Sequence, residues 1–238
     1  MLLPGPDGTG ELFVDFIAAL AGSWTATTIA YPTDRFLSYT ELRPLVTAAV
    51  PQSERFVLVA ESFSTPLAVW FATTNPPNLV AVVICAGFVA SPMGGWSGTV
   101  KALAKPLLFK LKPHRVVLEY FLLGQNPPPD LLQKLRHALD RVSPEVLSGR
   151  VREVLDCDAR DDLRRTAIPL LYLEATDDRL LPASCKEEFS HIRPDIQFRS
   201  IPAPHLVLQR EPQKAANHVT VLNGRNTEPN PAVARTVL

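Results

Sequence analysis

Short apolar runs alternate with helical patterns along this sequence, and this alternation constrains the fold more than any other feature. Runs such as RFVLVAE (55–61) and LVAVVICA (79–86) are apolar and β-branched, which is typical of strands covered on both faces. Strands are predicted at 1–3, 25–31, 55–61, 79–86, 168–175 and 196–202. Helices are predicted from about Gly10, at 39–50, at 64–74, around 184–191 and near 213–221. This order predicts a mainly parallel α/β sheet flanked by helices.

The alternation is interrupted once, between residues 88 and 167. This stretch has no strong strand signal and consists of helical pieces separated by Gly-rich and Pro-rich segments. We therefore predict a helical cap at 88–167, inserted into a core formed by 1–87 and 168–220. The last stretch, 221–238, has no periodic apolar face and is predicted to be a disordered tail.

Composition excludes several classes of function. The 238 residues carry 24 basic and 24 acidic side chains, so no net charge favours nucleic acid or an anionic membrane. Cys85, Cys157 and Cys185 are too few and too scattered for a disulfide framework or a metal site. No signal-peptide pattern and no apolar stretch of about 18 residues occurs, so we predict a cytoplasmic protein without a transmembrane segment. No cofactor and no metal are expected, and the oligomeric state stays open.

The segment LVAESFSTPLA (58–68) is the first candidate for chemistry. A strand that ends in small-x-Ser-x-small and continues directly into a helix is typical of a nucleophile elbow. The small positions here are Ala60 and Ser64, where glycine is usual, and Ser62 is the central residue. The alternative is that Ser62 or Ser64 is simply a helix N-cap.

A serine nucleophile needs a base and an acid that orients the base. His205 follows the last predicted strand, and Asp177 and Asp178 follow the strand before it. The chain order Ser, Asp, His is that of the elbow-type hydrolases, and all three positions lie at carboxyl ends of predicted parallel strands. Each residue alone could instead form a turn, cap a helix or lie exposed in a loop.

Four segments together resemble one known family. They are LPGPDGTG (3–10), ESFS (61–64), DRLLP (178–182) and PHLVLQ (204–209). In this order they are similar to the α/β-hydrolase family, in particular to a serine esterase and thioesterase-like subgroup with an L-P-G-x-D-G-T-G loop. The resemblance implies an α/β-hydrolase fold, with Ser62 as nucleophile, His205 as base and Asp178 as acid. Asp177 is then expected to brace the turn.

The glycine-rich loop departs from the family pattern at the oxyanion hole. The family usually offers the N–H of the residue after the first glycine, and here that residue is Pro6, which has no N–H. The hole is then expected to use the N–H of Phe63 together with the N–H of Asp7 or the hydroxyl of Thr9. The sequence also starts inside the first central strand, so the N-terminal edge strands of the fold are expected to be missing.

The substrate is predicted from the cap. Segment 101–124 mixes aliphatic and aromatic residues with scattered lysines, which favours an amphipathic lid packed over the core and not a membrane-surface helix. An apolar lid over a serine site suits a small-molecule carboxylic ester or thioester, hydrolysed through an acyl-enzyme. Two alternatives stay open: a non-catalytic binding protein with the same fold, and an acyltransferase that uses the same triad.

Overall fold

A five-stranded sheet forms the centre of the computed structural model, which describes residues 1–22 and 24–225. The strands are β1 (Leu2–Leu3), β2 (Phe56–Glu61), β3 (Leu79–Cys85), β4 (Leu170–Ala175) and β5 (Gln197–Ile201). They are hydrogen-bonded in sequence order, and every neighbouring pair is parallel. The predicted parallel sheet is therefore confirmed, with β2 between β1 and β3.

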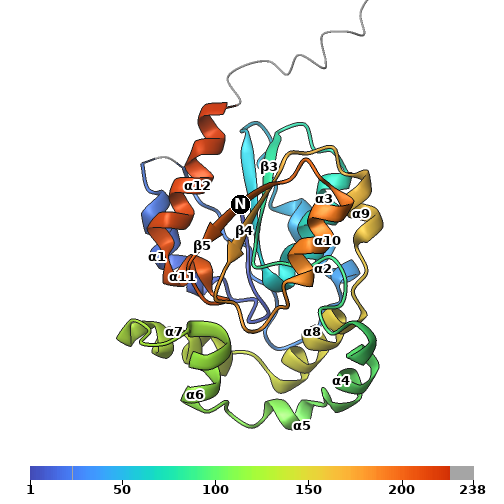
Figure 1. Ribbon diagram of the computed structural model, residues 1–238, viewed down its shortest axis with the longest axis vertical. Coiled ribbons are helices and arrows are strands. Elements are labelled where there is room, and N and C mark those ends of the chain that lie inside the picture. The colour runs from blue at the N-terminus through green and yellow to red at the C-terminus, as the bar shows by residue number, and fades with distance from the viewer. Residues whose placement is uncertain (23, 226–238) are drawn as a thin grey trace, which may run out of the picture.

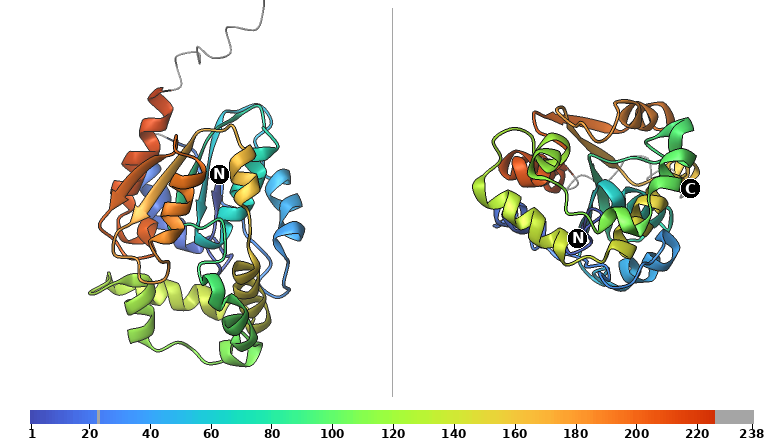
Figure 2. Two further views of the ribbon diagram at one scale, coloured as in Figure 1. Left: turned by 45° about the vertical axis from the view of Figure 1, so that its right-hand side comes forward. Right: turned by 90° about the horizontal axis from the view of Figure 1, so that it is seen from below.

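Helices cover both faces of this sheet, as Figures 1 and 2 show. One face carries α1 (Val14–Leu20), α11 (Val207–Arg210) and α12 (Pro212–Arg225). The other carries α2 (Tyr39–Ala48), α3 (Thr65–Thr73), α9 (Arg160–Arg165) and α10 (Ser184–Ile192).

The two layers of helices explain why β2 is apolar along its whole length. All six residues of β2 are buried. Leu58 and Ala60 belong to one apolar cluster, and Val57 and Val59 belong to another, as the two-residue period of a strand requires. Each face of the strand therefore contributes to a different half of the core.

Two predicted element boundaries are wrong. The strand predicted at 25–31 is reduced to one parallel bridge between Thr28 and Leu2. The strand beside it, β1, has two residues and cannot support a longer ladder of hydrogen bonds. The last helix, α12, continues to Arg225, beyond the predicted Val221. The rest of the predicted tail, 226–238, lies outside the described residues.

The segment between β3 and β4 is helical, apart from one antiparallel bridge between Ala90 and Asp158. Besides α9, its elements are η3 (Gly94–Trp96), α4 (Ser97–Leu103), α5 (Pro106–Phe109), α6 (Arg115–Leu118), the π-helix η4 (Glu119–Leu123), α7 (Pro129–Asp140) and α8 (Pro144–Asp156). Figure 1 shows α4 to α8 gathered below the sheet. We call α4 to α8 with their connections the insertion.

The insertion contacts the core through only part of its surface. Leu123, Leu131 and Leu135 form an apolar cluster with Leu12 and Leu206 of the core. By contrast, α4 and α5 contain no buried residue. The expectation of an amphipathic lid packed over the core is therefore wrong for these two helices. Among the residues that the structure describes, no helix is both long and apolar enough to cross a membrane.

Candidate active site

Ser62 lies in a sharp turn between β2 and α3. Its φ angle is 46°, in the left-handed region that residues other than glycine rarely adopt. The short 3₁₀ turn Ser62–Ser64 follows, and α3 begins at Thr65. Neither serine caps a helix with its side chain. The strained turn is that of a nucleophile elbow, and the N-cap interpretation of Ser62 is wrong.

Ser64 explains how this elbow works without its usual glycine. The Ser64 hydroxyl donates a hydrogen bond to the Pro4 carbonyl oxygen over 2.5 Å, and the Tyr31 hydroxyl lies 2.7 Å from Ser64 Oγ. Because the Ser64 hydroxyl proton is donated to Pro4 O, the Tyr31 hydroxyl must be the donor of the hydrogen bond to Ser64 Oγ. Ser64 and Ala60 are both fully buried. The serine therefore ties the elbow to the glycine-rich loop, which a glycine would not do.

His205 connects Ser62 to Asp178. Its Nε2 atom lies 2.9 Å from Ser62 Oγ, and its Nδ1 atom lies 2.7 Å from Asp178 Oδ2. Water has little access to this chain of groups, since Ser62 is 7% and His205 2% exposed. With an ionised Asp178, the hydrogen bond to Nδ1 holds the proton there and leaves Nε2 free to accept the serine proton. The three side chains named from the sequence therefore come together in one place.

Asp178 is held by the turn that follows β4. Its Oδ1 atom accepts hydrogen bonds from the N–H groups of Leu180 and Leu181, at 2.7 and 3.0 Å. These two bonds use one carboxylate oxygen for the turn and leave Oδ2 for His205. The D-R-L-L-P segment therefore orients the acid before any substrate binds.

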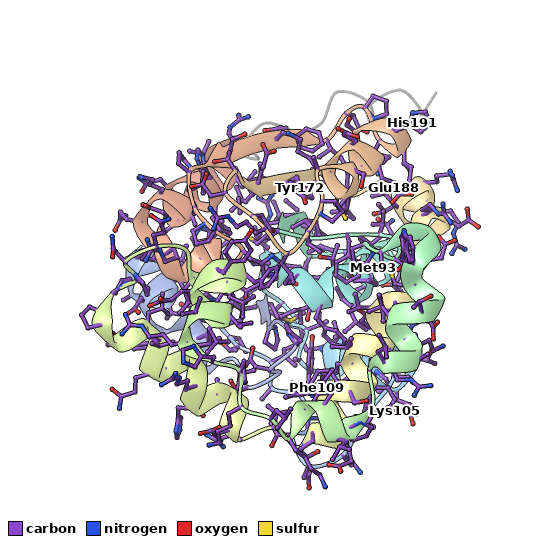
Figure 3. All side chains as sticks on the ribbon, turned by 60° about the horizontal axis from the view of Figure 1, so that its bottom comes forward. Met93, Lys105, Phe109, Tyr172, Glu188 and His191 are labelled. Atoms are coloured by element: carbon purple, nitrogen blue, oxygen red, sulfur yellow. The ribbon has the colours of Figure 1, made fainter. Side chains whose placement is uncertain are left out.

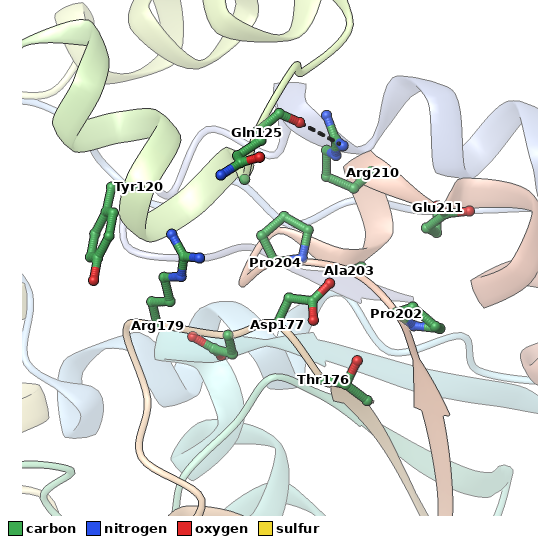
Figure 4. Close-up of a pocket in the computed structure, with 12 residues that line it drawn as sticks. Tyr120, Gln125, Thr176, Asp177, Arg179, Pro202, Ala203, Pro204, Arg210 and Glu211 are labelled. Carbon is green, nitrogen blue, oxygen red and sulfur yellow. Dashed lines mark hydrogen bonds between the residues drawn. The ribbon is translucent and has the colours of Figure 1, made fainter.

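Asp177 points elsewhere. Its side chain lines a cavity of about 540 Å³ together with Tyr120, Arg179 and Arg210, as Figure 4 shows. Arg179 stacks on the ring of Tyr120 at 4.5 Å, and Arg210 donates to the backbone oxygen of Gln125. Ser62 does not line this cavity. Asp178 borders the same cavity, but of the two adjacent aspartates only Asp178 has a hydrogen bond to His205.

The two peptides on either side of Phe63 are fixed in orientation. Ser62 O accepts a hydrogen bond from the N–H of Thr65, and Phe63 O accepts one from the Tyr39 hydroxyl at 2.8 Å. The Tyr39 ring also stacks on Phe63, with centroids 4.8 Å apart. In a trans peptide the N–H points opposite to its carbonyl, so the Phe63 N–H is directed away from α3.

The glycine-rich loop is held mainly by its own groups. Gly8 N–H donates to Gly5 O, and Asp7 Oδ1 accepts both the N–H and the hydroxyl proton of Thr9, at 2.9 and 2.5 Å. The Thr9 hydroxyl has only one proton, so it is not available as an oxyanion donor. Asp7 N–H is the candidate that this loop still offers.

Arg150 reaches this loop from α8 of the insertion. One guanidinium nitrogen donates to Pro6 O at 2.8 Å and Asp7 O at 2.9 Å, and the other donates to Pro32 O at 2.8 Å. The side chain is 1% exposed. A Cβ atom on Gly8 would lie 2.4 Å from the guanidinium, and Gly8 has a φ of 71°. Arg150 therefore requires glycine beside it and fixes the carbonyls on both sides of Asp7.

Two buried carboxyl groups lie behind the loop. A Cβ atom built on Gly5 would lie 3.5 Å from Glu61 and 3.7 Å from Asp7, so both carboxyl groups border the same glycine. Burial raises the pKa of Glu61 to about 7, with a further increase from the charge of Asp7. Burial also raises the pKa of Asp7, whereas its bonds to Thr9 and the charge of Arg150 lower it. Arg150 is thus a positive group that offsets the charge of Asp7.

Sequence patterns did not predict Arg150 or Glu61 as parts of the site. Arg150 lies in the segment SGRVREVLD, where alternating charges are typical of an exposed helix. Glu61 directly precedes Ser62 in the sequence, and no local pattern distinguishes it from an ordinary strand end. The one available signal was Gly8, since a glycine between Asp7 and Thr9 allows a large side chain to approach closely.

No family profile and no curated protein sequence matches this chain. Solved structures do resemble it. A thermophilic esterase from Thermogutta terrifontis has a TM-score of 0.76 and 16% identity, over 94% of this chain and 88% of its own. MenH from S. aureus has a TM-score of 0.77 and 11% identity, over 95% and 93%. MGS-M2, an alpha/beta hydrolase enzyme from a deep-sea metagenome of the Medee basin, has a TM-score of 0.69 and 15% identity, over 97% of this chain and 90% of its own.

These likenesses extend over most of each chain, and they concern the fold. Together with the parallel sheet and the elbow after β2, they show that this chain has the α/β-hydrolase fold. The predicted fold class is therefore confirmed. At 11–16% identity, activity and substrate do not follow from the likeness, and they are argued below from the site itself.

Proposed function

We propose that this protein is a serine hydrolase that cleaves a carboxylic ester or thioester through an acyl-enzyme on Ser62. The observation that carries the proposal is the position of His205, within hydrogen-bond reach of both Ser62 Oγ and Asp178 Oδ2. The left-handed turn at Ser62 supports it, because this strain serves to present a nucleophile at the carboxyl edge of a sheet. The likeness to an esterase and to an alpha/beta hydrolase agrees with it.

In the proposed reaction, Ser62 Oγ attacks the acyl carbon while His205 Nε2 takes the serine proton. Asp178 stabilises the imidazolium that forms and remains ionised. His205 then protonates the departing alcohol or thiol, and the acyl group stays on Ser62. Water attacks this acyl-enzyme with His205 again as base, which releases the carboxylic acid and restores the serine.

The negative oxygen of each tetrahedral intermediate requires hydrogen-bond donors. We assign this role to the N–H groups of Phe63 and Asp7. The Pro6 carbonyl is bonded to Arg150, so the Asp7 N–H, on the same peptide, points away from Arg150. Arg150 is a positioning residue in this proposal: it orients the donor and balances the buried negative charge of Asp7.

The test is turnover on a panel of soluble esters and the matching thioesters. Wild type should hydrolyse at least one acyl class, and Ser62→Ala should lower kcat by about 10⁴-fold or more with little change in thermal unfolding. Ser91→Ala is a matched control, since Ser91 is a partly buried serine whose hydroxyl bonds only to Ser97. Equal turnover by Ser62→Ala and wild type would refute the nucleophile. No turnover on any substrate, with no acyl-enzyme formed, would favour the non-catalytic binding alternative.

An acyltransferase would give a different result in the same assay. Added alcohols or amines would then increase the release of the leaving group and form a new ester or amide at the expense of free acid. Partition strictly to free acid would support hydrolysis.

A further inference from the structure

Exposed apolar side chains are concentrated in one part of the insertion. Of the 15 large apolar side chains that are exposed among the described residues, ten lie between Met93 and Phe121. Leu107 is 74%, Trp96 71% and Leu111 70% exposed. Isolated exposed apolar residues are ordinary, but a concentration of this kind marks an interaction surface.

These side chains do not form the inner face of a lid. Helices α4 and α5 have no buried residue, and α6 buries only Leu118. In Figure 1 these helices lie at the end of the molecule opposite the sheet, and Figure 3 views that end with Lys105 and Phe109 labelled. We call the surface of α4 to α6 the insertion tip. Its six most prominent aliphatic residues are Leu103, Leu107, Leu108, Leu111, Val116 and Val117.

The charge of the insertion tip has one sign. From Ser97 to Leu118 the sequence has no Asp or Glu and contains Lys101, Lys105, Lys110, Lys112 and Arg115.

Three of these basic groups are paired with acids outside the segment: Lys101 with Asp156, Lys112 with Asp140, and Arg115 with Glu119. Lys105 and Lys110 have no ion pair among the described residues and are exposed. The two free ammonium groups flank Leu107 and Leu108, so positive charge and apolar surface occur at the same place. Their charge is complementary to an anionic surface.

We propose that the insertion tip docks on an anionic lipid surface. Aliphatic side chains that project from short helices can enter the interfacial region of a bilayer, while the lysines next to them keep their ammonium groups among the phosphates. Lipid suits this surface, because the prominent residues of α4 to α6 are aliphatic and Trp96, beside α4, is a residue type enriched at the interface of a bilayer.

The sequence pattern did not predict this surface. A single amphipathic helix shows its basic and apolar faces in its periodicity, whereas α4, α5 and α6 are three short helices with separate axes. The zero net charge of the chain also conceals a local excess of positive charge. The inference does not depend on the proposed activity, since it concerns residues outside the candidate active site.

The test is sedimentation of the whole protein with vesicles in the absence of substrate. Vesicles of phosphatidylcholine alone are compared with vesicles containing about one third phosphatidylglycerol, at low and high salt. The expected result is at least about fivefold more binding to the anionic vesicles and a loss of that excess at about 1 M salt. Equal binding to both vesicle types, or no binding to either, would overturn the proposal.

Two pairs of substitutions assign the effect to residues. Leu107→Asp with Leu111→Asp should reduce vesicle binding about tenfold or more. The matched control is Val14→Asp with Val221→Asp, because these valines are 58% and 51% exposed on the core and should bind as wild type does. Lys105→Gln with Lys110→Gln should remove most of the preference for anionic vesicles while keeping the weak apolar component.

Other outcomes of these experiments contradict the proposal. If the core pair weakens binding as much as the tip pair, the contact is not specific to the tip. If wild type binds an immobilised acidic polypeptide and no vesicles, the occupant is a protein and not a lipid. Circular dichroism and turnover on a soluble ester should be equal in wild type and the tip variants, because the tip is separate from the triad.

Discussion

The carboxyl edge of the sheet buries polar side chains, whereas the insertion tip exposes apolar side chains to water. At the edge, Ser62, His205 and Arg150 are polar or charged and almost fully buried, and each is hydrogen-bonded to a group distant in sequence. At the tip, Leu107 and Leu111 are apolar and about 70% exposed or more. The first region is organised before any ligand arrives, since buried polar groups are stable only when they are paired. The second region has apolar surface that only a partner can cover.

Arg150 links the two regions. It belongs to α8 of the insertion, contacts the glycine-rich loop of the core, and lies on the helix that α4 and α5 pack against. The insertion is thus rigidly attached where it supports the candidate active site and unpaired at its far end. The predictions below test how separate these two roles are.

The largest expected effect is at the triad acid. Asp178→Asn should lower kcat on a soluble ester by about 10⁴-fold, because an amide no longer fixes the proton on His205 Nδ1. Asp177→Asn is the matched control and should retain activity within about threefold, since the hydrogen bond to His205 comes from Asp178 and not from Asp177. Steady-state kinetics of both variants on one ester provide the comparison. A larger loss for Asp177→Asn would reverse the assignment of the acid.

Substitution of Arg150 should have the second largest effect on kcat. Arg150→Met should lower kcat about tenfold to a hundredfold with little change in KM, because it loosens the donor peptide without touching bound substrate. Arg150→Lys should recover part of kcat, since lysine restores the charge but not the planar set of donors.

The matched control for Arg150 is Arg152→Met, two residues further along α8. A fall in thermal stability with unchanged kcat per folded molecule would show that Arg150 has only a structural role. Vesicle binding by Arg150→Met should equal that of wild type.

Pro6 should have a smaller effect. Pro6→Leu introduces an N–H into the glycine-rich loop, but Asp7 N–H already completes the proposed hole, so kcat should change by less than about threefold at constant KM. Turnover on a soluble ester, with Pro4→Leu as control, measures the effect. A rise in kcat of about threefold to tenfold would mean that the hole lacks a donor, and it would contradict the assignment of Asp7 N–H.

The smallest expected effect concerns Glu61. Its folded pKa is raised to about 7, so the folded protein binds the Glu61 proton more tightly than the unfolded chain does. The resulting stabilisation is complete below the unfolded pKa of 4.5 and is lost as the pH rises through 7.

The free energy of unfolding should therefore fall less between pH 5 and pH 8 in Glu61→Gln than in wild type. The difference should be on the order of 1–2 kcal/mol. Urea unfolding at both pH values measures it, and Glu54→Gln, on the surface, is the control. An identical pH slope in Glu61→Gln and wild type would contradict the raised pKa.

The sequence predicts those parts of the molecule in which burial leaves a local pattern. Strands β2 and β3 are covered on both faces, so every position is apolar and the pattern is unambiguous. Ser62, Asp178 and His205 could be named from the sequence because each follows a strand, and the carboxyl ends of parallel strands all lie at the same edge of the sheet.

The parts that could not be predicted depend on contacts between distant segments. Arg150 has the local pattern of a surface arginine, and only the approach of residues 6–8 and 32 buries it. The segment 25–31 has good strand propensity, yet its neighbour β1 is too short to pair with it. Segment 97–118 is apolar enough for a buried lid, and nothing local indicates that its side chains face away from the core.

The most direct test of the central claim is to locate the covalent adduct formed by a fluorophosphonate probe. The account predicts one probe per protein, attached to the peptide that contains Ser62, and at least about a thousandfold slower labelling of His205→Ala. Labelling of Leu107→Asp with Leu111→Asp should be as fast as that of wild type. No labelling of the folded protein, or an adduct on any residue other than Ser62, would contradict the account.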